Sequence, residues 1–209
     1  MKIIAAVFAL LILSGTARAQ SSEYWNLPAV IADSNGTIGF EVDSTWHLVH
    51  GSTKGISGKA WLADSSDYRS VKAELHLPVA RFDTDNSSRD KKMRKVMQSD
   101  TFPEVVFFIE KLSEACDPRS LQLDASCNIL IDGKLKIRDV LRPLVFKATA
   151  LHSDKGYQVH GSTAFKWADF GVEDPSIFIA KLDETVVVRF TVLLPDQVPA
   201  DEFKMEQNG

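Results

Sequence analysis

The sequence predicts an all-β fold of antiparallel strands, and two observations carry this prediction. Apolar and polar residues alternate with a period of two along most of the chain, which is typical of antiparallel strands with one buried face. Clusters of turn-forming residues separate the alternating runs, for example at 33–36, 65–67 and 153–156. About eight strands at near-regular spacing predict one domain, either a sandwich or a closed barrel.

The expected strands follow in chain order, and a single internal stretch departs from their period. The alternating runs cover residues 38–42, 71–79, 105–112, 129–137, 144–150, 157–165 and 186–194. Residues 89–97 instead predict a short helix with a Ser87-Ser88 cap, because Met93, Val96 and Met97 are spaced as one apolar helix face. The dipeptide Phe102-Pro103 ends this helix and starts the next strand.

The first nineteen residues have the pattern of a secretory signal peptide. Lys2 precedes an apolar run at 3–13, and Ala17-Arg18-Ala19 supplies the small residues of a cleavage site. The run is shorter than the roughly 20 residues that span a bilayer, so a membrane anchor is the weaker alternative. We therefore expect cleavage after Ala19, a periplasmic or secreted protein, and no integral membrane segment in the mature form.

These boundaries predict three parts: a leader at 1–19, one domain at 20–195 and a polar tail at 196–209. Removing the leader takes away Lys2 and Arg18, so the formal net charge changes from −4 to −6. Nucleic acid is an unexpected partner for such an acidic chain, because phosphate binding needs a basic surface.

The sequence offers no catalytic or metal-binding constellation. It lacks a G-x-S-x-G motif and a glycine-rich phosphate loop, and Asp139 and Asp169 are isolated carboxylates. His47 and His50 would point to opposite faces of a strand and could not share a metal ion. We expect a protein that is not an enzyme and has no cofactor.

Cys116 and Cys127 are the only cysteines, and in an exported protein they predict a disulfide. In the chain-entropy model, closing a loop of this length contributes about 3 kcal/mol. Two buried free thiols are the alternative, and a metal site is disfavoured because no histidine lies in the loop.

The predicted helix carries five cations between Arg89 and Lys95, which allow two interpretations. They form a solvated face opposite the apolar residues, or they make a charged lid beside a barrel mouth. In the second interpretation Arg89 meets an anionic head group, and Met93 and Met97 pack around an irregular apolar ligand. Methionines as ordinary core filler explain the inner face equally well.

Four segments, in this order, resemble the YceI-like family of exported lipid-binding proteins. They are residues 37–62, 89–108 (RDKKMRKVMQSDTFPEVVFF), 135–143 (LKIRDVLRP) and 165–175 (FKWADFGVEDP). The resemblance implies an eight-stranded, lipocalin-like antiparallel barrel with a short helix. It also implies an interior that takes a long isoprenoid chain, such as a polyprenyl or quinone tail.

Two further expectations concern individual residues of such a barrel. Strand parity gives candidate cavity-lining residues, for which ordinary core packing is the alternative: Phe40, Trp46, Phe107, Phe146, Phe165 and Phe190. The segment before residue 128 is longer than the family pattern, and a tight hairpin would keep Cys116 far from Cys127. We expect residues 117–126 to loop out, with the disulfide pinning the loop.

The leading hypothesis is an exported, non-enzymatic protein that sequesters or carries a long-chain isoprenoid lipid. The alternative is a secreted stress-response or interaction module whose barrel is filled by side chains, and an enzyme acting on a lipid head group ranks third. A continuous apolar cavity distinguishes the first from the second. The sequence does not specify the lipid, or whether the protein forms a homodimer.

Overall fold

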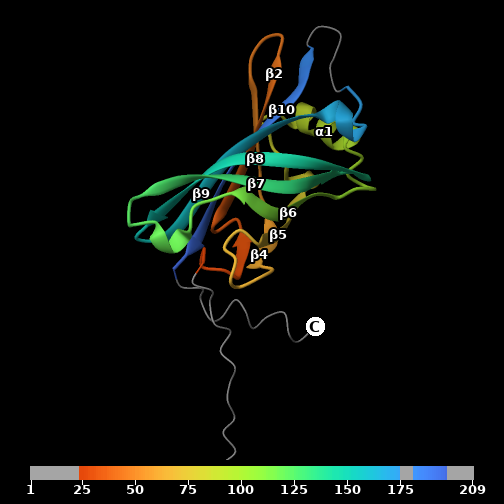
Figure 1. Ribbon diagram of the computed structural model, residues 1–209. Helices are drawn as coiled ribbons and strands as arrows, with labels where there is room; N and C mark the ends of the chain where they lie inside the picture. The colour runs from red at the N-terminus through yellow and green to blue at the C-terminus, as the bar shows by residue number, and fades with distance from the viewer. Residues whose placement is uncertain (1–23, 175–180, 197–209) are drawn as a thin grey trace, which may run out of the picture.

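The computed structural model describes residues 24–174 and 181–196. The predicted leader, with its cleavage site, and residues 197–209 of the predicted tail lie outside the described residues. Within the described residues, ten antiparallel strands form one strongly curled sheet, and a single α-helix lies at one of its ends (Figure 1). The all-β prediction with one short helix is therefore confirmed.

The strands have the following bounds: β1 Ala29–Ala32, β2 Gly36–Ser44, β3 Val49–Thr53, β4 Ser57–Leu62, β5 Val71–Pro78, β6 Glu104–Glu114, β7 Ser126–Ile137, β8 Val140–Ser153, β9 Gly156–Lys166 and β10 Leu182–Pro195. Their order in the sheet is β1-β4-β5-β6-β7-β8-β9-β10-β2-β3. From β4 through β10 each strand pairs with its sequence neighbour, which is the up-and-down arrangement of a simple barrel.

The sheet has ten strands where eight are predicted, because one hairpin is interrupted in both of its arms. β1 pairs with β4 and β2 pairs with β3, so β1–β2 and β3–β4 are the two arms of that hairpin. On their outer sides, β2 pairs with β10 and β4 pairs with β5. The bent hairpin thus joins the first part of the sheet to its last strand, and counting each arm once gives the predicted eight.

Asp33 holds the two interruptions together. It lies in the break between β1 and β2, and its carboxylate accepts hydrogen bonds from the backbone N–H groups of Gly55 (2.7 Å) and Ile56 (2.9 Å) in the opposite break. These two bonds lower the pKa of Asp33, because they stabilise the ionised carboxylate. The sequence pattern marked 33–36 as a turn, and in the folded chain the turn is a bend within one arm.

The predicted alternation places the core inside the barrel. On β5, Val71, Ala73, Leu75 and Leu77 are buried, and the polar residues between them face outward and are half-buried. The same period of two holds on β7 from Ile129 to Ile137. One wall of the barrel is therefore a conventional core face, as alternation predicts.

Helix α1 spans Ser87–Val96, and its N-cap is Asn86 instead of the predicted serines. The Asn86 side chain accepts a hydrogen bond from the backbone N–H of Arg89 at 3.0 Å. Ser87 and Ser88 occupy the first helical positions. The prediction of a serine cap was wrong because asparagine caps a helix as well as serine does, and the chain turns one residue earlier.

Because consecutive strands run in opposite directions, the connections divide between two ends of the barrel. The helix end carries α1, the hairpin tip 45–48, the turn 138–139, and two short 3-10 helices, η1 (Val79–Arg81) and η3 (Trp167–Phe170). The disulfide end carries residues 24–28, 63–70, 115–125 and 154–155, including η2 (Pro118–Ser120). In Figure 1, the β2–β3 tip lies at the top and α1 lies at the upper right. The two ends of the described chain lie below.

Candidate functional site

A cavity of about 320 Å³ lies inside the barrel. Inward-facing residues of all ten strands line it, and α1 contributes to its wall at the helix end. This volume is at the lower end of the ~300–1,000 Å³ typical of small-molecule sites. The interior is therefore partly empty space.

The empty space lies against one side of the barrel. Inward-facing residues of β5 and β7 are buried. Most of those of β2 and β10 are only half-buried although they also point inward: Ile38, Phe40, Val42, Val186, Val188, Phe190 and Val192. Gly36 and Leu194, toward the disulfide end, are buried. The half-buried residues are covered by fewer side chains than their counterparts across the barrel. The cavity therefore runs beside the β2–β10 pair.

Five of the six residues predicted to line a cavity do lie on its wall: Phe40, Phe107, Phe146, Phe165 and Phe190. Phe146 makes edge-to-face contacts with Phe107 (ring centroids 4.7 Å apart) and with Phe190 (5.4 Å). Phe165 contacts Phe170 of η3 in the same way at 5.2 Å. Aromatic side chains thus form much of the cavity surface.

Glycines on neighbouring strands make room for two of these rings. A Cβ atom on Gly51 would lie 2.2 Å from the ring of Phe40, its partner across the β2–β3 pair. A Cβ atom on Gly161 would lie 2.8 Å from the ring of Phe190, its partner across the β9–β10 pair. Each ring occupies the space of a missing side chain and stays against the sheet, which leaves the centre open.

Trp46 does not line the cavity, and this prediction was wrong. The side chain lies in the hairpin tip at the helix end and is 72% exposed. Strand parity places it inward only if β2 continues to residue 46, but β2 ends at Ser44, where the Ser44 hydroxyl donates to the His47 carbonyl oxygen and the chain turns. Parity carries no information beyond the end of a strand.

Polar side chains reach the cavity wall at the helix end. Among the described residues that line it, the polar or charged side chains, apart from indole nitrogens, are Thr53, Thr84, Arg89 and Lys92. No carboxylate lies among these lining residues. The cavity is therefore an apolar chamber with hydroxyl and cationic groups near the start of α1.

A hydrogen-bond network fixes the Arg89 side chain. Its Nε donates to the Thr84 hydroxyl at 2.8 Å, and its Nη2 donates to the Thr84 carbonyl oxygen at 2.6 Å. Thr84 in turn donates through its backbone N–H (3.1 Å) and its hydroxyl (2.6 Å) to one oxygen of Asp90. Thr84 and Asp90 are 4% and 7% exposed, so the guanidinium is held by a buried support.

The structure brings all three predicted lid residues to the cavity. Arg89, Met93 and Met97 line it, together with Lys92 and Val96 on the same helix face. Helical spacing from Arg89 and Met93 could have identified Lys92, but no pattern marks Thr84, which lies in an irregular segment. Lys91 and Lys95 are exposed, so the basic helix combines a solvated face with two cations at the cavity wall.

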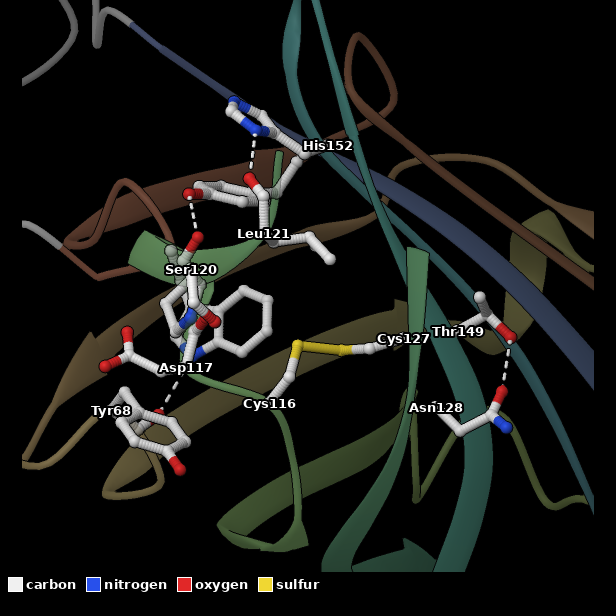
Figure 2. Close-up of a disulfide and its surroundings, with 12 residues drawn as sticks. Tyr68, Cys116, Asp117, Ser120, Leu121, Cys127, Asn128, Thr149 and His152 are labelled. Atoms are coloured by element: carbon white, nitrogen blue, oxygen red, sulfur yellow. Dashed lines mark hydrogen bonds between the residues drawn. A yellow bond between two sulfur atoms is a disulfide. The ribbon is translucent and has the colours of Figure 1, made fainter. Parts of the chain in front are cut away.

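At the disulfide end, Cys116 and Cys127 form the predicted disulfide (Figure 2). The expected loop over 117–126 is present, and it spans residues 115–125 between β6 and β7. The loop is fastened to β8 and β9: His152 Nδ1 donates to the Leu121 carbonyl oxygen (2.8 Å), and the Tyr157 hydroxyl donates to that of Pro118 (3.0 Å). Burial raises the pKa of Tyr157, with smaller contributions from nearby Asp196 and Asp117.

Trp25 and Leu27 fill the same end from inside, which no sequence pattern indicated. They are 2% and 1% exposed, and both lie on the cavity wall. The Trp25 indole donates to the Tyr68 carbonyl oxygen at 2.8 Å and packs edge-on against Tyr157 at 5.4 Å. The polar groups of the cavity are thus at one end and an aromatic plug is at the other.

Within the described part of the chain, no three His, Cys, Asp or Glu side chains gather in a way that could hold a metal ion. His50 faces Glu41 at 3.4 Å. Over the same residues, no helix has the length and apolar character needed to cross a bilayer.

Comparison with known proteins places the chain by sequence and by fold. Residues 30–194 match the YceI-like domain family. A search among curated proteins found no match.

Solved structures with the same fold come from several bacteria. BcnA of Burkholderia cenocepacia is 15% identical, with a TM-score of 0.63 over 75% of this chain and 94% of its own. A polyisoprenoid-binding domain from Saccharophagus degradans, implicated in plant cell wall breakdown, is 15% identical, with a TM-score of 0.63 over 79% and 95%. The YceI protein of Campylobacter jejuni is 18% identical, with a TM-score of 0.54 over 72% and 86%. Because the family match covers most of the chain and the barrel agrees with it, this protein belongs to the YceI-like family.

Proposed function

We propose that this protein is an exported, non-enzymatic carrier that holds one long-chain isoprenoid amphiphile inside its barrel. The observation that carries the proposal is the apolar cavity of about 320 Å³ beside β2 and β10, with its polar groups near the start of α1. Membership of a family whose structural relatives include a polyisoprenoid-binding domain supports this ligand class. Export is proposed on the leader-like residues 1–19.

The chemistry of the wall suits a branched hydrocarbon chain. Burial of apolar carbon contributes about 0.8 kcal/mol per CH₂, so a tail of about twenty carbons offers on the order of 16 kcal/mol before costs. Ordering the tail and losing translational freedom remove a large part of this. Phenylalanine rings and methionine thioethers can repack around methyl branches, which favours an isoprenoid over a rigid ligand.

The polar groups suggest how the amphiphile is oriented. Arg89 is held in place by Thr84, and Thr53 and Lys92 lie on the same part of the wall. A head group that accepts hydrogen bonds, such as a phosphate or a quinone oxygen, would be bound here, and the tail would extend toward Trp25 and Leu27. An uncharged hydrocarbon without acceptor groups would form no hydrogen bond with this part of the wall.

The cavity weighs against the alternative of an interaction module with a filled barrel. In such a protein the inward residues of β2 and β10 would be as well covered as those of β5 and β7, and they are not. We propose no cofactor and no catalytic step, because a carrier only has to bury its lipid and release it.

The direct test is mass spectrometry of an organic extract of gently purified protein. We expect a long-chain lipid with an acceptor head group, at up to one molecule per protein. Val188→Phe should remove it, because Val188 lies on the cavity wall and the larger side chain occupies the space of the tail. Val187→Phe is the matched control, since Val187 is the adjacent residue on the opposite face of β10.

Repeated extracts without lipid, together with no uptake of added polyprenyl compounds by the wild type, would refute carriage. A co-purifying hydrocarbon without a polar head would refute the assigned orientation. Equal loss of lipid from both variants would mean that the β10 change acts on the fold and not on the cavity.

A further inference from the structure

Large apolar side chains are exposed at the helix end of the barrel. In the β2–β3 tip, Trp46 is 72% exposed and Leu48 is 43% exposed. This tip lies at the top of Figure 1, next to the start of β10. Leu141, at the start of β8, is exposed at the same end. Exposed aromatic and aliphatic residues that cluster at one end of a molecule commonly mark an interaction surface.

The outer face of α1 carries positive charge at the same end of the barrel. Lys91 and Lys95 are exposed, whereas the one acidic residue of the helix, Asp90, is buried and bonded to Thr84. Asp85 and Asp100 lie outside the two ends of the helix, and Lys95 lies in its last turn. The chain as a whole has a formal charge of −4, which makes this local cluster a departure from the overall charge.

The segment before the helix is bonded to the hairpin that ends in this tip. Ser52 of β3 exchanges two backbone hydrogen bonds with Asp83, each 2.9 Å long. Asp83 lies three residues before Asn86, the helix cap. Phe40 and Phe82 also pack together across this junction, with ring centroids 5.7 Å apart. The segment that leads into α1 is thus fastened to the hairpin that carries Trp46 and Leu48.

We propose that the helix end docks on an anionic phospholipid surface, with Trp46 and Leu48 in the interfacial region and Lys91 and Lys95 against the head groups. Tryptophan prefers the boundary between acyl chains and head groups, and lysines near an anionic bilayer each add attraction. Lysine stems and an indole ring suit such a surface better than a flat polar protein face. This inference rests on the proposed function in one respect: docking at this end places the polar part of the cavity next to the bilayer, where cargo enters and leaves.

Vesicle co-sedimentation tests the docking. We expect the full-length protein to bind vesicles of phosphatidylcholine mixed with phosphatidylglycerol, to bind vesicles of phosphatidylcholine alone much more weakly, and to dissociate at high salt. The double variant Lys91→Gln/Lys95→Gln should weaken anionic binding by about 25-fold, since each lysine contributes about fivefold. Lys59→Gln/Lys155→Gln makes the same change in charge at exposed positions away from this end and should leave binding unchanged.

The hydrophobic contribution is tested with a second matched pair. Trp46→Ser should lose several-fold in anionic-vesicle binding, whereas Leu123→Ser, at an exposed apolar residue in the disulfide-end loop, should have no effect. Both residues are surface positions outside the cavity wall, so extracts of both variants should contain the same lipid as the wild type.

Equal binding of the wild type to neutral and anionic vesicles would overturn the proposal, and so would equal losses in a variant and its control. Absence of any vesicle binding would also overturn it and would favour a protein partner at this end. The two proposals fail separately: vesicle binding that responds to Lys91 and Lys95 in a protein without extractable lipid leaves docking intact and refutes carriage.

Discussion

At the scale of single residues, the polar groups of the site depend on contacts that run across the chain. Arg89 comes from the helix and Thr84 from the segment before it, and Asp90 holds Thr84 without being one of the lining residues of the cavity. The sequence indicated Arg89 because it stands in a recognisable basic helix. It did not indicate Thr84, because a threonine in an irregular segment has no periodic signal, and its role exists only after the helix has packed.

A pH dependence is expected from His76 on the outer face of β5. Its Nδ1 faces Glu104 at 2.8 Å and its Nε2 faces Glu74 at 3.1 Å. The hydrogen bond to Glu104, and after it the one to Glu74, raise the pKa of His76 above the ordinary 6.5, although partial burial opposes this.

Because the folded state binds this proton more tightly than the unfolded state, the stabilisation is fully present below pH 6.5 and is lost as the pH rises through the raised pKa. We expect wild type to exceed His76→Gln in free energy of unfolding below about pH 6, and the difference to shrink above about pH 8. Urea unfolding of both proteins across this range measures it. A difference that grows with pH would contradict the assignment.

At the scale of elements, the prediction succeeded where one period governs a segment and failed at the segment ends. Alternation located β5 to β10, and helical spacing located the apolar face of α1. The helix cap was misplaced, and strand parity was applied to Trp46 beyond the end of β2, because both depend on where the chain turns. Turn positions are set by local hydrogen bonds, such as those of Asn86 and Ser44. The periodicity of apolar residues does not predict these bonds.

The disulfide-end loop gives a prediction at this scale. Cys116→Ser/Cys127→Ser should lower the free energy of unfolding by about 3 kcal/mol, because the bond restricts the unfolded chain across a separation of 11 residues. The loop should also open locally. Asp124 donates its backbone N–H to the His152 carbonyl oxygen at 2.8 Å, and this amide should exchange faster in the variant.

Denaturant unfolding and amide hydrogen exchange measure the two effects. Amides in the middle of β5 exchange through global unfolding, so they report the loss of global stability, and the amide of Asp124 reports local opening of the loop. Unchanged exchange at Asp124 would show that the bonds from His152 and Tyr157 hold the loop without the disulfide.

At the scale of the whole molecule, the decisive feature is the uneven filling of the barrel. β5 and β7 present a packed core face, while β2 and β10 face empty space. Glycines opposite Phe40 and Phe190 keep these rings against the wall. A barrel of this kind is less stable than a filled one, because its lining lacks packing partners.

Val188→Phe should therefore stabilise the lipid-free protein by about 1 kcal/mol, as cavity-filling substitutions commonly do, while it removes cargo. Thermal unfolding of delipidated wild type, Val188→Phe and Val187→Phe measures the effect, with Val187→Phe expected to show no gain. Destabilisation of Val188→Phe by overpacking would mean that no usable space exists beside β10.

The sequence by itself determined the all-β class, most strand positions, the disulfide and the basic, methionine-faced helix. These follow from local periodicity, from composition and from the pairing of the only two cysteines, all of which can be inferred directly from the sequence. The tertiary structure alone decided that the interior is partly empty, that Thr84 holds Arg89, and that Trp46 is exposed at the rim. The physical reason is that alternation specifies which way a side chain points, whereas packing across the barrel decides whether anything meets it.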